Sequence, residues 1–311
     1  MRLAFFRMAG DYKKATVAID AQDEIGESPT WDGTRERLLW ADHSTGRVHE
    51  AKMSASGHWA QTNLWELRRY LAAVIPRKSG GFIALGATGI DLVDESGASI
   101  PLARLDAQPG EKFNDAKCDS RGRIWSGTLT AEFKSGAAAL YRIDPDGTIT
   151  RMHEGLTLAN GLAWSPDERT FYLIDSLAQT VDAFDFDIGA GTLANRRTLV
   201  RVENGAPNGM TVDSDGELWV AITGAGEVRH YAADGRLLGR VEISTPGATS
   251  CEFGGAQRDI LFITSRSGHM PDIAKNIGLT PQMMNNDGDT AGALFTVTPG
   301  AKGLPSRAYP R

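Results

Sequence analysis

One short phrase recurs six times along the chain, and its spacing restricts the fold more than any other feature. Each copy has an acidic or glycine-containing turn followed by a strand-like run that ends in small polar residues. The copies begin at Trp31, Arg77, Cys118, Trp164, Val212 and Phe253, and are 46, 41, 46, 48 and 41 residues apart. A period of about 40–45 residues with four short strands is typical of a propeller blade. The spacing therefore predicts an all-β, six-bladed β-propeller with a central channel.

Further turns lie between the copies, at 94–97, 144–147 and 232–235, each followed by an alternating strand pattern. Glycine accepts positive φ in such turns, so they join antiparallel strands. The one weak helical pattern lies near 272–286. A β-sandwich is the rival fold, but it does not predict six evenly spaced copies. We expect residues 1–17 to form an N-terminal extension or edge strand, and 18–311 to form a single six-bladed β-propeller domain.

Composition limits the partners and the compartment. The net charge is −6 with no basic cluster, so neither a nucleic acid nor an anionic membrane surface is an expected partner. No apolar run of about 18 residues predicts a membrane-spanning helix, and the first residues lack a signal-peptide core. The two cysteines, Cys118 and Cys251, make no disulfide framework and are expected to be buried thiols. These features predict a cytoplasmic protein, a monomer by default.

Four oxygen-bearing side chains occupy equivalent places in different copies. Asn160 and Asn208 open matching Asn-Gly phrases just before the expected innermost strands, and Glu27 and Asn114 precede the first and third copies in the same way. Rotation about the channel would place all four around one mouth, unless the Asn residues only stabilise turns. An oxygen-only ring with one carboxylate suits Ca²⁺ or Mg²⁺, and Mn²⁺ or Fe²⁺ are alternatives.

Other catalytic patterns are absent from the sequence. No histidine pair has the spacing of a helical zinc site, and no Gly-x-Ser-x-Gly or Gly-x-Gly-x-x-Gly motif occurs. A serine hydrolase and a dinucleotide-binding fold are therefore disfavoured. His43 follows a strand of the first copy, so a place at the channel mouth is a minor alternative to a structural role.

Eight phrases in order resemble the SMP-30/gluconolactonase/luciferin-regenerating family over roughly residues 18–310. They are "IGESPTWD", "FNDAKCDSRGRIWSGTL", "AALYRID", "ANGLAWSPD", "YLIDSLAQTVDAFDFD", "NRR", "PNGMTVDSDGELWVA" and "TSCEFGG". The resemblance implies a six-bladed propeller that hydrolyses sugar lactones with one divalent cation in its channel. Ca²⁺ is the favoured ion, with Zn²⁺, Mn²⁺, Mg²⁺ and Fe²⁺ as alternatives.

The resemblance also implies roles for individual residues. Glu27 matches the family's metal-binding carboxylate, and Asn160 matches its amide ligand. Asn114 and Glu132 match residues that contact the substrate. Lys112 stands where the family commonly has arginine, so a planar bidentate contact is replaced by a point charge.

Asn208 is the larger departure, because the family usually has an aspartate there that binds the metal and acts as the general base. An amide oxygen can still bind a cation, but it cannot accept a proton at neutral pH. Three explanations remain open at this point. Asn208 is a natural change, with metal-bound water or Glu132 serving as base; it is a deliberate substitution; or hydrolysis is lost and binding is kept.

The leading hypothesis is a metal-dependent lactonase that acts on a small sugar lactone. Its catalytic positions are Asn208 and Glu132, its substrate contacts are Lys112, Asn114 and Glu132, and its metal ligands are Glu27, Asn160 and Asn208. A non-catalytic or base-impaired propeller that binds a metal or metabolite is the alternative. An esterase or phosphotriesterase is a third hypothesis, which rests on analogy alone.

Overall fold

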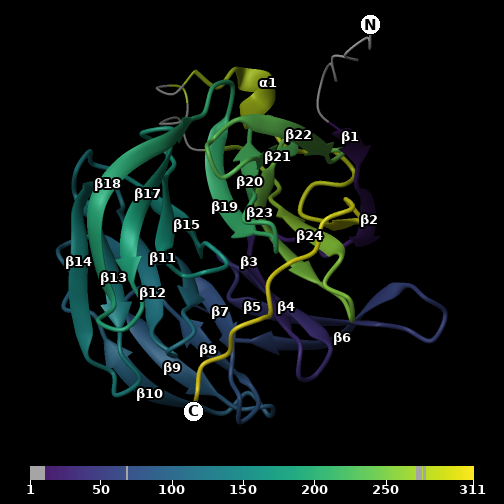
Figure 1. Cartoon of the computed structure of the whole chain (residues 1–311). Helices are drawn as coiled ribbons and strands as arrows, with labels where there is room; N and C mark the ends of the chain where they lie inside the picture. Colours follow the sequence, from purple (N-terminus) through teal and green to yellow (C-terminus); the bar gives the residue numbers. More distant parts are fainter. Residues whose placement is uncertain (1–10, 68, 271–274, 276–277) are drawn as a thin grey trace, which may run out of the picture.

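The computed structural model describes residues 11–311 except 68, 271–274 and 276–277 (Figure 1). Its strands form six sheets around one axis, each built mainly from consecutive antiparallel strands. The predicted all-β, six-bladed propeller is confirmed. Each repeated phrase covers the turn after the first strand of a blade and the second strand, and in five of the six blades also the end of the first strand.

The first three blades each contain four strands in sequence order from the channel outward. Blade one contains β3 (Gly26–Asp32), β4 (Arg37–Asp42), β5 (Arg47–Met53) and β6 (Trp59–Glu66). Blade two contains β7 (Ala73–Pro76), β8 (Phe82–Leu85), β9 (Gly89–Val93) and β10 (Ser99–Arg104). Blade three contains β11 (Glu111–Cys118), β12 (Ile124–Thr130), β13 (Ala138–Ile143) and β14 (Ile149–Leu156).

Blades four to six follow the same plan, and the last two take up the N-terminal strands. Blade four contains β15 (Ala159–Trp164), β16 (Thr170–Asp175), β17 (Thr180–Asp187) and β18 (Thr192–Arg201). Blade five contains β19 (Ala206–Val212), β20 (Leu218–Thr223), β21 (Glu227–Tyr231), β22 (Leu237–Glu242) and β1 (Asp11–Lys14). Blade six contains β23 (Ala248–Gly254), β24 (Ile260–Ser265), β25 (Leu294–Val297) and β2 (Thr16–Ile19).

Two sets of strand contacts close the ring of six blades. The first strand of each blade contacts the first strand of the next, and β23 contacts β3. β2 pairs antiparallel with β25, so the N-terminal part of the chain completes the blade formed by its C-terminal part. β1 adds a parallel strand to the outer edge of β22.

Helix is almost absent from the described residues. Within the segment expected to be weakly helical, only α1 (Pro281–Met284) is an α-helix, and 272–274 and 276–277 lie outside the described residues. No helix of the described chain is long and apolar enough to span a membrane.

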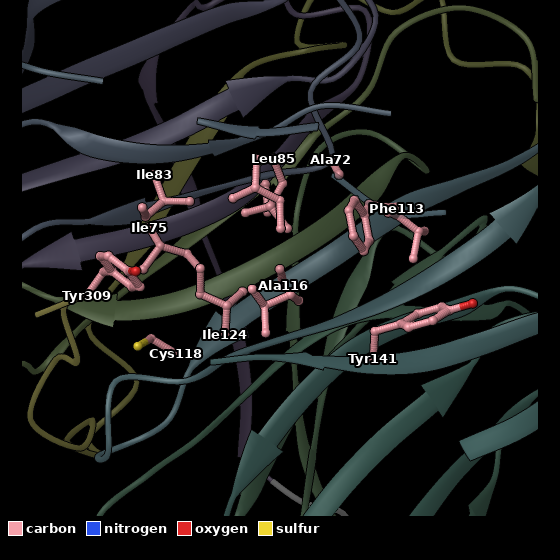
Figure 2. Packing of buried hydrophobic residues seen from close by; sticks show 14 of the residues in the cluster. Ala72, Ile75, Ile83, Leu85, Phe113, Ala116, Cys118, Ile124, Tyr141 and Tyr309 are labelled. Carbon is pink, nitrogen blue, oxygen red and sulfur yellow. The ribbon is translucent and has the colours of Figure 1, made fainter. Parts of the chain in front are cut away.

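Apolar side chains fill the spaces between neighbouring blades. In the cluster between blades two and three, Ile75 and Ile83 meet Ala116 and Ile124, and Tyr309 from the C-terminal segment packs on the same group (Figure 2). The alternating apolar residues of adjacent sheets therefore form the core. Cys118 and Cys251 are buried free thiols, as expected.

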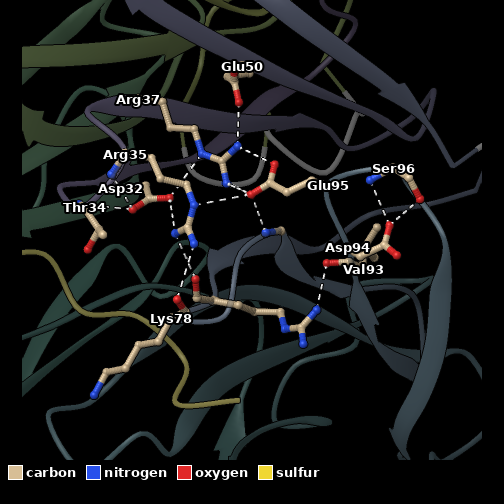
Figure 3. A network of polar contacts seen from close by, with 12 residues as sticks. Asp32, Thr34, Arg35, Arg37, Glu50, Lys78, Val93, Asp94, Glu95 and Ser96 are labelled. Atoms are coloured by element: carbon tan, nitrogen blue, oxygen red, sulfur yellow. Dashed lines mark hydrogen bonds and ion pairs between the residues drawn. The ribbon is translucent and has the colours of Figure 1, made fainter.

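A buried ion network joins blades one and two beside the turn between β3 and β4 (Figure 3). The Arg37 guanidinium contacts Asp32 at 3.1 Å, Glu50 at 2.6 Å and Glu95 of the second blade at 2.8 Å. Because Arg37 is almost fully buried, these carboxylates supply the partners that such a buried charge requires.

The C-terminal segment crosses the end of the channel at which the innermost strands finish (Figure 1). It contacts all six turns that join the first and second strands of the blades. The contacts are Lys302 O with Ser214 N (2.7 Å), Gly303 N with Arg258 O (2.7 Å), Ser306 Oγ with Gly33 N (3.2 Å), Arg307 with Glu168, Tyr309 O with Lys78 N (2.9 Å), and Pro310 against Gly122.

A cavity of about 90 Å³ remains between this segment and the innermost strands. Its lining includes Leu304, Arg307 and strand residues Lys117 and Glu252. The segment therefore forms a floor across one end of the channel, and the opposite end is the one where functional side chains were expected.

We expect Tyr309→Ala to destabilise the propeller by about 3–5 kcal/mol, as for other large aromatic truncations in packed cores. The ring is fully buried, and its hydroxyl donates to Pro145 O at 2.9 Å. Tyr309→Phe is the matched control, because it removes only a hydrogen bond, typically about 1 kcal/mol. Denaturant unfolding measures both, and a loss below about 1 kcal/mol for Tyr309→Ala would contradict the role of this segment as a clamp.

Candidate functional site

The four oxygen-bearing residues lie inside the innermost strands, not before them as the sequence suggested. Glu27 is in β3, Asn114 in β11, Asn160 in β15 and Asn208 in β19. Each lies at a point where the register with the second strand shifts. Such bulges redirect side chains locally. The shifts explain how these polar residues can face the channel from strands that are otherwise almost entirely buried.

Two glycines hold neighbouring strands close together beside these residues. A Cβ on Gly161 would lie 2.5 Å from Asn208 O, and a Cβ on Gly209 would lie 2.0 Å from Ser250 Oγ. Neither position can therefore carry a side chain. The Asn-Gly phrases combine a polar side chain with the close strand approach that brings it next to the neighbouring blade.

The three asparagines use their amide NH₂ groups as donors to the surrounding protein. Asn160 Nδ2 donates to Ser176 Oγ at 3.1 Å, and Asn208 Nδ2 donates to Thr223 Oγ1 at 3.0 Å. Asn114 Nδ2 donates to the carbonyl oxygen of Ala159 at 3.0 Å. These bonds fix the amides and leave their oxygens as the free acceptors.

Glu27 and Asn208 meet at this end of the channel. Glu27 is 4% exposed, and its Oε2 accepts from Ser28 N at 3.3 Å. The Asn208 amide also lies within hydrogen-bonding reach of this carboxylate. Burial, followed by the nearby Asp115 carboxylate, holds the pKa of Glu27 well above its usual range.

The donor set fits a hard divalent cation. Asn208 Oδ1 is buried without a hydrogen-bond partner, which is costly unless a ligand takes that place. It lies near a buried carboxylate, and the Asn160 amide is held in the adjacent strand. Oxygen donors of this kind suit Ca²⁺. The assignment of Glu27, Asn160 and Asn208 as ligands stays a prediction.

Asp115 is a site residue that sequence reasoning missed. It follows Asn114 within the bulge of β11 and is 3% exposed; its Oδ1 accepts from Ala116 N at 2.8 Å, while Oδ2 has no partner. Burial raises the pKa of Asp115 to about 6. The phrase "FND" places this acid directly after a predicted site residue, but alternation along a regular strand would have turned it away.

One wall of the mouth is built from Lys112, Tyr70 and His43. Lys112 Nζ lies 4.1 Å from the centroid of the Tyr70 ring, and the His43 ring lies 5.4 Å from the same ring. His43 Nε2 contacts Ala72 O at 2.7 Å, so it donates there as a neutral imidazole. Burial lowers the pKa of His43 to about 4.

Glu132 lies apart from the buried group. It is exposed in the loop after β12, near the start of β11, where Ala131 N donates to Gly110 O at 3.0 Å. Glu132 therefore stands on the rim of the same mouth, where it can meet a bound molecule from outside.

A second group with metal-ligand chemistry lies in blade five, formed by Asp213, Glu217 and His230. His230 Nε2 is 2.7 Å from Glu217 Oε2, and the His230 ring stacks on Trp219, whose Nε1 donates to Asp213 Oδ2 at 2.9 Å. Blade one repeats this arrangement with other residues: Trp40 Nε1 donates to Asp23 Oδ2, and His49 stacks on Trp40 while contacting Asp23. The repetition favours a packing role for both groups.

Comparison with known proteins identifies a matching family and similar chains. Residues 25–267 match the family described as the SMP-30/Gluconolactonase/LRE-like region. The chain is 36% identical to regucalcin of Danio rerio over 303 residues, which covers 95% of this chain and 98% of that protein. It is 32% identical over 292 residues to the pentonolactonase XacC of Haloferax volcanii, covering 93% and 96%. A crystal structure described as a calcium-binding regucalcin of Agrobacterium tumefaciens superposes with a TM-score of 0.82 at 23% identity, covering 96% and 99%.

Glu27→Gln should weaken binding of Ca²⁺ by about tenfold or more, because the number of charged ligands tunes the affinity of a calcium site. Calorimetric titration of the folded protein measures the change. His230→Gln is the matched control, since it alters the second candidate group in blade five. Equal affinity for Ca²⁺ in the wild type and in Glu27→Gln, with weaker binding in His230→Gln, would show that the cation binds in blade five and not in the channel.

The contribution of His43 to stability should fall as the pH is lowered from about 6.5 to about 4, the window between the ordinary pKa of histidine and the lowered pKa of His43. The unfolded chain protonates this histidine first, so acid lowers the His43 contribution, whereas the raised pKa values of Asp115 and Glu27 act in the opposite direction. A shift of this size corresponds to about 3 kcal/mol. His43→Gln keeps a donor for Ala72 O and should remove this part of the pH dependence, whereas exposed His58→Gln should not; chemical denaturation at several pH values tests both.

Proposed function

The chain belongs to the SMP-30/gluconolactonase/LRE-like family, and on that premise we propose that it hydrolyses a sugar lactone with a divalent cation bound in the channel. The observation that supports the proposal most is the buried oxygen group of Glu27, Asn160 and Asn208, with Asn208 Oδ1 unpartnered. The relative XacC, a pentonolactonase, aligns over nearly its full length. Ca²⁺ is the proposed ion, because all donors are oxygens.

The cation would polarise the lactone carbonyl and stabilise the negative charge that develops on its oxygen. The chain's own residues would bind and orient the substrate. Asn114 would hold substrate hydroxyls, Lys112 would contact a polar group of the substrate at the mouth, and the surrounding burial would exclude bulk water. A water molecule adds its oxygen to the carbonyl carbon, the ring C–O bond breaks, and the ring oxygen takes a proton to give the open hydroxy acid.

The proton of the attacking water requires an acceptor, and Asn208 cannot supply one. Glu132 is the proposed base, because its carboxylate stands exposed on the rim of the same mouth. Asn208 is then a cation ligand at a position where the family resemblance implies an aspartate that is both ligand and base. The same residue favours one alternative, a propeller that binds a cation or metabolite without turnover.

An activity panel separates these proposals. Aldonolactones, aryl esters and organophosphates would each be assayed in the presence of Ca²⁺ and after removal of metal with EDTA. The proposed function expects turnover of aldonolactones that disappears with EDTA and returns with Ca²⁺. Binding of Ca²⁺ without turnover of any of the three substrate classes would favour the non-catalytic alternative.

Asn208→Asp should raise kcat for lactone hydrolysis, by at most the roughly 10²–10⁴ that a general base usually contributes, because it adds a second proton acceptor besides Glu132. The substitution keeps the side-chain shape and adds a carboxylate beside Glu27. Asn204→Asp is the matched control, because it adds the same charge at an exposed position of the loop before β19. An unchanged rate in Asn208→Asp, with Ca²⁺ bound, would show that position 208 does not hold the base.

A further inference from the structure

Two cations flank the channel mouth without carboxylate partners, and we propose that they recognise a carboxylate on the substrate. The proposed substrate is therefore an anionic lactone, a sugar-acid lactone that keeps a second, free carboxylate, rather than a neutral aldonolactone. This inference rests on the proposed lactonase function and concerns the same site. Lys112 is the proposed direct partner of the substrate carboxylate, and Arg266 strengthens the positive potential from the opposite side.

Lys112 is near the start of β11 in blade three, at the mouth end of the channel. Its Nζ lies over the Tyr70 ring at 4.1 Å, and no ion pair joins it to a carboxylate of the described residues. The Tyr70 hydroxyl donates to Phe113 O at 3.0 Å, so the phenol is held as a neutral aromatic surface. Burial lowers the pKa of Lys112, as expected for an ammonium group that lacks an anionic partner.

Arg266 directly follows β24 in blade six. β24 runs antiparallel to β23, with Ser265 beside Ala248, so Arg266 lies at the same end of the channel as Lys112. It also bridges to Ile25, two residues before Glu27. Blades three and six are opposite each other in a ring of six, so the two cations stand on opposite sides of the axis.

The guanidinium of Arg266 has only carbonyl oxygens as close partners among the described residues. Nε donates to Ser267 O at 3.4 Å, and a terminal nitrogen donates to His269 O at 3.0 Å. Burial lowers the pKa of Arg266, and Glu27 opposes that shift from a longer range. A partly buried charge with no carboxylate in direct contact is costly, and a bound anion would relieve the cost.

The charge of the site supports an anionic ligand over a neutral one. Glu27 and Asp115 are the buried carboxylates of the cluster, and Glu27 is the proposed ligand of a divalent cation. Asn208 contributes an oxygen but no negative charge. With the cation bound, Lys112 and Arg266 leave an excess of positive charge that a neutral lactone would not balance.

Two lactones of the same stereochemistry test the inference. Galactaro-1,4-lactone carries a free carboxylate at C6, where galactono-1,4-lactone carries a neutral CH₂OH group. We expect the Ca²⁺-loaded wild type to show a kcat/KM about tenfold to a hundredfold higher for galactaro-1,4-lactone, as for one charged hydrogen bond. Lys112→Met should remove most of this preference, Arg266→Gln should reduce it less, and Lys112→Arg should keep it.

Calorimetry of the Ca²⁺-loaded protein with the open-chain products gives a readout besides turnover. Galactarate should bind more tightly than galactonate in the wild type, and the difference should shrink in Lys112→Met. Lys52→Met and Arg197→Gln are matched controls; Lys52 pairs with Glu50, and Arg197 is half exposed and pairs with Asp185. Neither control should change the preference, and thermal unfolding establishes that each variant is folded.

Different experimental results would overturn this inference and the proposed lactonase function. No turnover of either lactone and no product binding would overturn the lactonase proposal itself. Equal or faster turnover of galactono-1,4-lactone would overturn the anionic substrate and leave the lactonase proposal standing. An equal loss for both lactones in Lys112→Met would also overturn it, because the ammonium group would then serve hydroxyl binding or local packing.

Discussion

The innermost strands of neighbouring blades approach each other too closely for a side chain at Gly161 and at Gly209. This close approach narrows the channel until the polar residues of separate blades lie side by side. The Asn208 amide then reaches Glu27, and the Asn114 amide reaches the backbone of the next blade. A larger residue at either glycine would push two strands apart and separate the group that the site depends on.

The same group shows why amides serve at this site. Two carboxylates, Glu27 and Asp115, are already buried close enough for each to raise the cost of the other's charge. Each asparagine adds an oxygen without adding to that repulsion. Its NH₂ group anchors it, within the same blade for Asn160 and Asn208 and to the next blade for Asn114. The arrangement gives a set of acceptors whose positions are fixed by hydrogen bonds.

Much of the fold followed from one repeated pattern, because each copy of the phrase encodes the same turn and inner strand pair. The number of copies predicted the number of blades, and the matching Asn-Gly phrases predicted that Asn160 and Asn208 occupy equivalent positions around the axis. The bulges could not be read from the sequence, so the polar residues were expected before the strands and Asp115 was missed. Arg266 and the floor formed by Gly303 and Tyr309 depend on contacts across most of the chain, for which the local pattern holds no information.

The way both ends of the described chain are used has a consequence for biosynthesis. β2 completes a blade whose other strands lie at the far end of the sequence, and the residues near Tyr309 join all six turns of the floor. On a ribosome, individual blades can form as they emerge, but the ring and its floor have to wait until residues 302–310 have emerged. Until then, the earlier blades would expose apolar faces that this segment covers, which makes its emergence the critical step for this fold.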